Sequence, residues 1–257
     1  MTATEARGAS AVHVDDLPIV DDERPMRGEP GASYLAQVWA VARKDLLLEA
    51  RSRERLVAMA TFAVLVAVVF SFSIDPTAVR ARSIAGAMIW VTVLFAGTLG
   101  LGRSFALERE ADALTGLMVA PVERGALFLG KWLANVVIVG AVEAVIFPAY
   151  ALFFGLAWPA GSLPALLAVV FCATAGFLAL GTLFAGVAAH TRMGETLLPI
   201  LLLPLLIPVV IFASSATQRL LVGRPVAEVA SQLRMLAAFG LIFLFTCTAL
   251  FGSVLEE

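Results

Sequence analysis

Side chains that commonly carry out chemistry in enzymes and metalloproteins are few in this chain. It has two histidines, His13 and His190, and two cysteines, Cys172 and Cys247, which both lie in apolar runs. None of them has the spacing of a metal site or a redox motif, and the sequence has no Gly-rich phosphate loop and no nucleophile elbow. We therefore expect no catalytic residue, no metal, no directly bound cofactor and no ATPase activity in this chain.

One acidic side chain, Glu143, lies deep inside a long apolar segment. A carboxyl group is costly to place inside a membrane, so it should face the interior of a helix bundle or a cavity, or be protonated. A structural hydrogen bond to a neighbouring helix and a role in gating both remain open. An intramembrane enzyme would need a positioned partner for this acid, and the sequence offers no base one turn away.

The composition is that of an integral membrane protein. Of the 257 residues, 60% are hydrophobic and 15% are charged, whereas soluble domains average about half apolar and a quarter charged. A helix needs about 20 apolar residues to cross a bilayer. We predict an all-α protein with six transmembrane helices, over residues 56–74, 84–102, 126–156, 163–189, 197–213 and 235–255.

Two of these segments are unusual. The third is too long for one straight crossing, and Lys131 near its start and Pro148 late in it indicate a broken or strongly tilted helix. The fifth contains Pro199, Pro204 and Pro208, and each proline removes a backbone hydrogen bond. Inside a membrane the freed groups must be satisfied by neighbouring helices or water. We therefore expect this span to pack within the protein, either as a kinked helix or as a functional hinge.

The chain divides into two predicted parts. Residues 1–32 are polar and acidic, so they cannot bury enough apolar area to fold and should form a disordered cytoplasmic tail. Residues 33–257 form the predicted membrane domain, which begins with an amphipathic helix capped by Ser33 and suited to the membrane interface by Trp39.

Basic residues in the flanks of the spans indicate the orientation of the chain. With both termini in the cytoplasm, the basic residues of the cytoplasmic flanks outnumber those of the outer flanks. The cytoplasmic set is Arg43, Lys44, Arg51, Arg53, Arg55, Arg103, Arg109, Arg124, Lys131 and Arg192, and the outer set is Arg80, Arg82, Arg219, Arg224 and Arg234.

The segment 103–132 is the longest charged stretch between two spans. Leu107, Ala111, Leu114 and Met118 recur at the spacing of one helix face, and the charged residues fall mostly on the other face. A short amphipathic helix at the membrane surface, followed by a corner and a second helix, is therefore predicted; a solvated connector is the alternative. The charged face and the corner consist of Glu108, Arg109, Glu110, Asp112, Gly116 and Pro121.

The letters E-R-E, G-L-M-V-A-P-V and L-G-K-W in this segment resemble the cytoplasmic coupling loop of ABC exporter permeases of the second type. Ala120 departs from the Ser or Thr that is usual before the proline. The resemblance implies a fold with a coupling helix between spans two and three. It also implies that this loop contacts a separate ATPase subunit.

Three further stretches, at 44–56, 134–155 and 191–211, resemble the CcmB family of haem exporter permeases in cytochrome c maturation, and the similarity covers about residues 34–257. The resemblance implies a homodimeric permease subunit in the bacterial inner membrane, with an ATPase subunit, CcmA. It also implies the haem-handling protein CcmC, the small subunit CcmD and the haem chaperone CcmE as partners, and no nucleic acid. ATP hydrolysis in that family is thought to release the haem-loaded chaperone, so haem would be handled by partner subunits.

Two other functions remain open at this stage. The chain could be an ABC-type exporter permease for another substrate, such as a lipid-linked glycan or a drug. It could also be a membrane scaffold that transmits motion of the ATPase without transporting anything.

Overall fold

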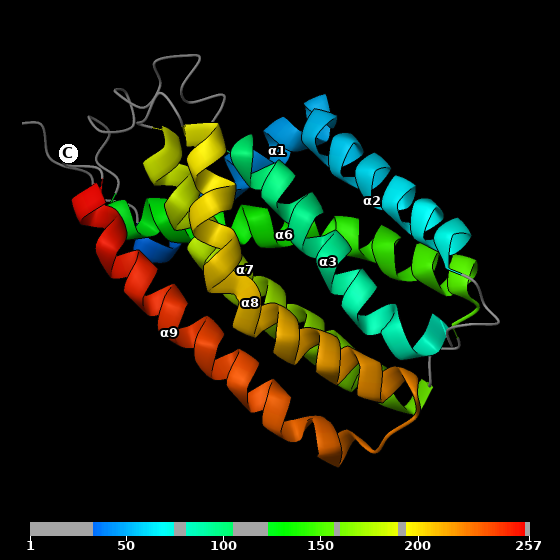
Figure 1. Cartoon of the computed structure of the whole chain (residues 1–257). Coiled ribbons are helices and arrows are strands. Elements are labelled where there is room, and N and C mark those ends of the chain that lie inside the picture. Colours follow the sequence, from blue (N-terminus) through cyan, green and yellow to red (C-terminus); the bar gives the residue numbers. More distant parts are fainter. Residues whose placement is uncertain (1–32, 75–80, 105–122, 157–159, 190–193, 255–257) are drawn as a thin grey trace, which may run out of the picture. The chain divides into compact units, whose positions relative to one another are not determined.

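The computed structural model describes residues 33–74, 81–104, 123–156, 160–189 and 194–254, and the regular structure within them is helical (Figure 1). The long helices are α1 (Tyr34–Ser52), α2 (Glu54–Ser73), α3 (Ala81–Gly102), α6 (Arg124–Phe154), α7 (Leu163–Ala189), α8 (Gly194–Leu221) and α9 (Ala230–Val254). Two short 3₁₀ turns, Ala160–Ser162 and Val226–Val229, precede α7 and α9.

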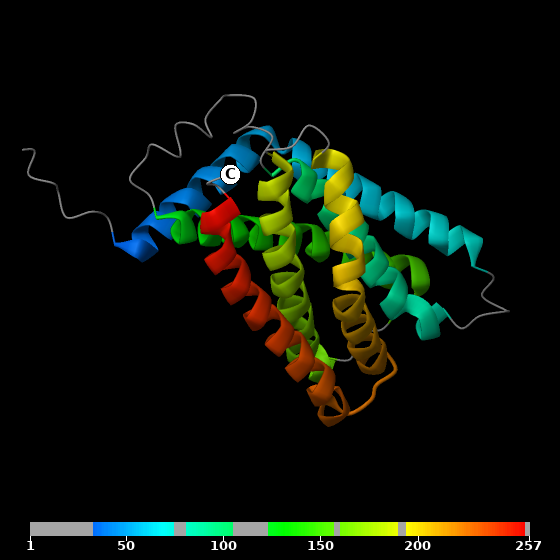
Figure 2. The same ribbon diagram turned by 60° about the vertical axis from the view of Figure 1, so that its left-hand side comes forward.

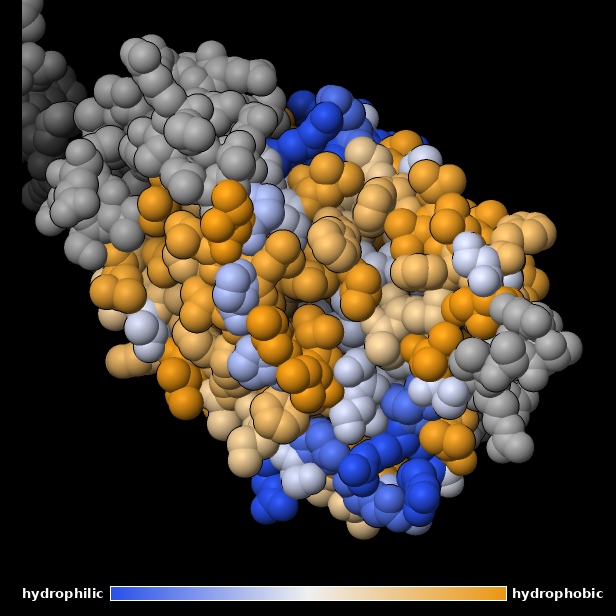
Figure 3. Space-filling view, viewed as in Figure 1, coloured by the Kyte–Doolittle hydropathy of each residue, from blue (hydrophilic) through white to orange (hydrophobic). Residues whose placement is uncertain are grey.

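Six of these helices, α2, α3 and α6 to α9, are long and apolar enough to cross a membrane. The prediction of an all-α membrane protein with six spans is therefore confirmed. In the space-filling view, hydrophilic side chains gather at two opposite edges and a broad apolar surface separates them (Figure 3). That distribution suits a bundle whose middle faces lipid and whose ends face water.

Helix α1 is the amphipathic helix expected before the first span. The Ser33 hydroxyl accepts a hydrogen bond from the Ala36 N–H at 3.4 Å, which caps the helix. Arg53 ends the helix in the left-handed conformation, with φ of 54°, and its N–H donates to the Glu49 carbonyl. The chain thereby turns directly into α2 at Glu54, so the surface helix and the first span share a tight corner.

Helix α6 settles how the long third segment is accommodated. It is one continuous helix of 31 residues with Pro148 inside it, which at 1.5 Å per residue is about 46 Å long. A hydrocarbon core of about 30 Å is shorter than that. Figures 1 and 2 show α6 crossing α7 obliquely. The segment is therefore one unbroken helix, and its length fits a strong tilt in the membrane.

Close packing of α7 on α9 depends on two glycines that face each other. A Cβ added to Gly176 would lie 3.1 Å from the Cα of Gly240, so the two backbones are in contact. Lipid is as apolar as the helix surfaces, so spans associate through van der Waals contact and interhelical hydrogen bonds rather than through the hydrophobic effect. Small residues permit that contact here.

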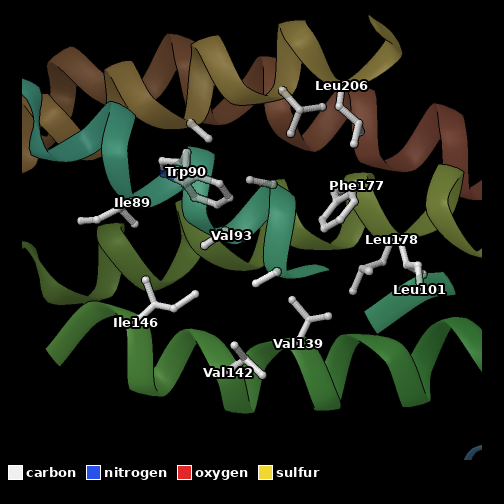
Figure 4. Packing of buried hydrophobic residues seen from close by; sticks show 14 of the residues in the cluster. Ile89, Trp90, Val93, Leu101, Val139, Val142, Ile146, Phe177, Leu178 and Leu206 are labelled. Atoms are coloured by element: carbon white, nitrogen blue, oxygen red, sulfur yellow. The ribbon is translucent and has the colours of Figure 1, made fainter. Parts of the chain in front are cut away.

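The core lies where α3, α6, α7 and α8 meet (Figure 4). Trp90 and Val93 of α3 face Phe177 of α7 and Leu206 of α8, with Ile146 of α6 on the opposite side. Buried hydrogen bonds cross this core, among them one from Trp90 Nε1 to Thr217 Oγ1 at 2.9 Å and one between the hydroxyls of Thr92 and Tyr150 at 2.7 Å. They fix α3 against α8 and α6.

Candidate functional site

A polar network lies at the end of the bundle between Ser104, just after α3, and Glu123, just before α6. We call this the loop end, because residues 105–122 connect these two positions. The network consists of Asp45 and Glu49 on α1, Arg55 on α2, Ser104, Lys131 and Asn135 on α6, and Thr182 on α7.

Lys131 is the buried charge of the network. Its side chain is 1% exposed, and Nζ donates to Asp45 Oδ2 at 3.2 Å and to the Ser104 carbonyl at 3.4 Å. A buried ammonium is tolerated only when it is paired and hydrogen-bonded. Gly130 makes the pairing possible, because a side chain there would collide with Val41 and hold α1 away from α6.

Asn135, one turn further along α6, joins three other elements. Its Oδ1 accepts hydrogen bonds from Arg55 Nη1 at 3.1 Å and from Ser104 Oγ at 3.2 Å, and its Nδ2 donates to Thr182 Oγ1 at 3.0 Å. One buried amide therefore holds the start of α2, the end of α3 and the C-terminal part of α7 together. Buried networks of this kind are rigid when every member is satisfied.

Glu49 completes the corner between α1 and α2. Its carboxylate accepts from Arg55 Nε at 3.2 Å and from the backbone N–H of Leu56 at 2.9 Å. An acidic group at the start of a helix is favourable because the unpaired N–H groups and the helix dipole point toward it. The surface helix and the first span are thus linked by a charged contact as well as by the chain.

Helix α1 also contacts the other boundary of the loop. Gln37 Oε1 accepts from the backbone N–H of Glu123 at 2.9 Å. Tyr34 lies over Gly125, and partial burial together with the charge of Glu123 raises the pKa of its phenol. Arg124 Nη1 donates to the Gly252 carbonyl of α9 at 2.9 Å. Both ends of the loop are therefore held by helices of the membrane domain.

The residues predicted to contact an ATPase subunit lie outside the described residues. These are Glu108, Arg109, Glu110, Asp112, Gly116 and Pro121. The coupling helix that contains them stays a prediction. His13, His190 and the tail 1–32 also lie outside the described residues, so the predicted disorder of the tail stays a prediction too.

Sequence reasoning singled out Lys131 but missed the residues that surround it. Glu49 accepts a hydrogen bond from Arg55, and Asp45 accepts one from Lys131. Asn135, a polar residue within an apolar run, is the signal that could have indicated a buried contact.

The second polar region of α6 is around Glu143, which is 4% exposed. Thr174 Oγ1 on α7 donates a hydrogen bond to Glu143 Oε1. The carboxyl is thus hydrogen-bonded to a neighbouring helix, as one of the two interpretations of the sequence expected. It also lines a cavity of about 580 Å³ between α6 and α7. Whether it has a role in gating stays a prediction. Within the described residues, no group of His, Cys, Asp and Glu side chains could hold a metal ion.

The three prolines of the fifth span are accommodated in a helix that runs without interruption from Gly194 to Leu221. Leu202 and Leu206 on its buried face contact the core, whereas Pro204 and Pro208 are exposed. The span thus packs on the bundle along one face, and the carbonyls freed by Pro204 and Pro208 belong to Ile200 and Pro204 on its exposed face. A hinge at Pro199, Pro204 and Pro208 stays a prediction.

These features define a class: a multi-pass helical membrane protein with a surface helix and a charged network at one end of the bundle. The chain belongs to the CcmB protein family, whose model matches residues 36–255. The resemblance found in the sequence is therefore confirmed.

Curated relatives support the assignment. The chain is 31% identical to heme exporter protein B of Pseudomonas aeruginosa over 185 residues, which cover 72% of this chain and 82% of the relative. It is 31% identical to heme exporter protein B of Paracoccus denitrificans over 198 residues, covering 77% and 88%. The corresponding protein of Escherichia coli K12 is 29% identical over 178 residues, covering 69% and 80%.

Proposed function

We propose that this chain is the permease subunit of an ABC-type complex for cytochrome c maturation in the bacterial inner membrane. ATP hydrolysis by a separate ATPase subunit drives the release of a haem-loaded chaperone, or another step of haem handling, through motion of this subunit. Both termini lie in the cytoplasm, so the ATPase reaches the loop end. The relatives are named heme exporter protein B, which supports the link to haem.

The network at the loop end is the observation that carries this proposal. A force applied to residues 105–122 acts on Ser104 and Glu123, which bond Lys131, Asn135 and Gln37. Through Asn135 the same force reaches α2 and α7. A satisfied polar network transmits displacement because its members cannot move separately without leaving buried groups unpaired.

The outward face of α8 supports assembly as a homodimer. A proline leaves the carbonyl four residues back without its helical partner. In a membrane such groups need protein or water nearby. A second copy that covers Pro204 and Pro208 would supply that environment, and it would place two loop ends side by side for a pair of ATPase subunits.

Haem chemistry belongs to the partner subunits in this proposal. Haem iron is held by His, Cys, Met or Tyr side chains. Cys172 and Cys247 lie within spans α7 and α9, and the cavity beside Glu143 is lined by none of these residue types among the described residues. CcmC and CcmE would accordingly bind and pass on haem, with CcmD as a small subunit beside them, while this chain supplies motion.

The test is charge reversal of the predicted acidic face. Changing Glu108, Glu110 and Asp112 together to Lys should abolish co-purification with the ATPase subunit and stop cytochrome c production, because like charges across an interface cost several kcal/mol. Reversal of Glu228 to Lys, at the opposite end of the bundle, is the matched control and should leave both unchanged. Normal co-purification of the triple variant would reduce residues 103–132 to a solvated connector.

A second candidate function, export of a different substrate, is favoured by one observation: the apolar cavity that contains Glu143 lies within the membrane domain. It does not require haem or a chaperone. The amount of cytochrome c in a strain that lacks this chain decides between the two candidates. Cytochrome c should be lost only if the chain serves cytochrome c maturation.

A further inference from the structure

The cavity between α6 and α7 has the size and lining of a small-molecule site. Its volume is about 580 Å³, and pockets that bind small molecules measure about 300–1,000 Å³. Apolar side chains such as Phe147, Leu166 and Phe171 form its walls. Glu143 and Thr174 are the polar side chains among its lining residues.

The Glu143 carboxyl is satisfied on one oxygen only. Thr174 donates to Oε1. Every fully enclosed side-chain nitrogen or oxygen in the described part of the chain has a hydrogen-bond partner. Since no hydrogen bond is found to Oε2 among those residues, Oε2 must border the cavity. A side chain that is 4% exposed thus directs its remaining acceptor into an apolar space.

We propose that this cavity binds a membrane-dissolved molecule with an apolar body and one protonated amine, with the amine placed at Oε2 of Glu143. A carboxylate in apolar surroundings is stable when a cation with N–H donors lies beside it. No Lys, Arg or His side chain lines the cavity among the described residues, so the amine of the ligand would supply the cation that pairs with the ionised form of Glu143. The inference concerns a site that the proposed coupling mechanism does not use.

Other occupants lack this complementarity. A phospholipid acyl chain would match the apolar walls but would leave Oε2 unpaired. A molecule whose polar groups are carboxylates would be repelled by Glu143. The geometry therefore selects for a positive charge as well as for apolar surface.

Gly140 provides a way to fill the cavity without touching the acid. It lies in the lining, and a Cβ added there would meet nothing within 4 Å. A phenylalanine at this position should therefore occupy the cavity while the helices keep their places. Gly102, at the end of α3, has equally open surroundings and is the matched control.

The experiment measures binding of two fluorescent probes to the purified chain in lipid nanodiscs. One is a dansyl-tagged long-chain alkylamine, and the other is the alcohol with the same body. The amine should bind about tenfold or more tightly than the alcohol, as expected for a charge pair away from water. Glu143→Gln, which keeps an acceptor for Thr174, should remove that difference. Gly140→Phe should weaken both probes, and Gly102→Phe should weaken neither.

Several outcomes would overturn the proposal. Equal binding of amine and alcohol to the unmodified chain would eliminate the role of charge. Unchanged binding to a folded Gly140→Phe variant would eliminate the cavity. If neither probe binds, and a cysteine at Leu167 cross-links to another membrane protein in cells, the groove is an interface for a partner helix. If Glu143→Gln fails to fold, Gly140→Phe still decides whether the cavity is the site.

Discussion

Helix α6 carries two polar regions, the first at Lys131 and Asn135 and the second at Glu143, which lies about 12 Å beyond Asn135 along the helix axis. In the first region each buried polar group is held by residues from at least two other elements. In the second region one carboxyl receives a single hydrogen bond from one neighbour and borders an open cavity. A saturated network suits transmission of force, whereas a half-satisfied group suits reversible binding. One helix thus combines a rigid polar network near its start with a cavity suited to binding near its middle.

The largest expected effect is at the charge pair of the rigid polar network. Asp45→Ala removes the carboxylate beside an ammonium that is 1% exposed, so we expect about 3–5 kcal/mol of destabilisation. Lys131→Met should cost less, because Asp45 retains Lys44 at 3.0 Å and is partly exposed. The free energy of unfolding of each variant is measured in mild detergent with increasing denaturant, and proteolytic cleavage within α1 reports the unfolded fraction. A smaller loss for Asp45→Ala than for Lys131→Met would contradict this burial argument.

Next comes the amide that joins four elements. Asn135→Leu should destabilise the bundle by about 1–3 kcal/mol, because it leaves Thr182 and Ser104 without their buried partner. Val137→Leu, on the exposed face of the same helix turn, is the control and should have no effect. Equal thermal stability of the two variants would show that the network is not rigid.

A comparable loss of stability is expected where the backbones of α7 and α9 are in contact. Gly176→Leu would push a side chain into Gly240 of α9 and should cost about 1–3 kcal/mol through overpacking. Gly102→Leu has open space and should be neutral. Thermal unfolding of both variants in the same detergent is the measurement, and a neutral Gly176→Leu would mean that α7 and α9 separate easily.

The smallest effect is expected at the exposed ion pair between Arg103 and Glu54. Its N–O distance of 2.7 Å is short, but the side chains are 52% and 76% exposed. Exposed pairs contribute less than about 1 kcal/mol. Arg103→Ala should therefore leave stability nearly unchanged, although it adjoins the network. A loss as large as that of Asn135→Leu would place Arg103 within the rigid unit.

Sequence reasoning reached the spans, the cap at Ser33 and the family because these depend on local pattern: apolar length, helical spacing and short motifs. It could not reach the partners of Lys131, since the pairing of α1 with α6 joins residues 86 positions apart. The amphipathic pattern of α1 gave no sign that Asp45 pairs with Lys131 or that Glu49 pairs with Arg55. The same limit applies to Gly176 and Gly240, whose contact depends on how α7 crosses α9.

The central claim is that the loop end transmits motion of the ATPase to the spans through Asn135. The direct test measures cytochrome c production and ATP turnover in membranes that contain Asn135→Leu at the level of the unmodified chain, with the ATPase subunit present. We predict that the ATPase still co-purifies and still hydrolyses ATP, while cytochrome c production falls at least about tenfold, a loss of about 1.4 kcal/mol in coupling. Production equal to that of the unmodified chain would contradict the account.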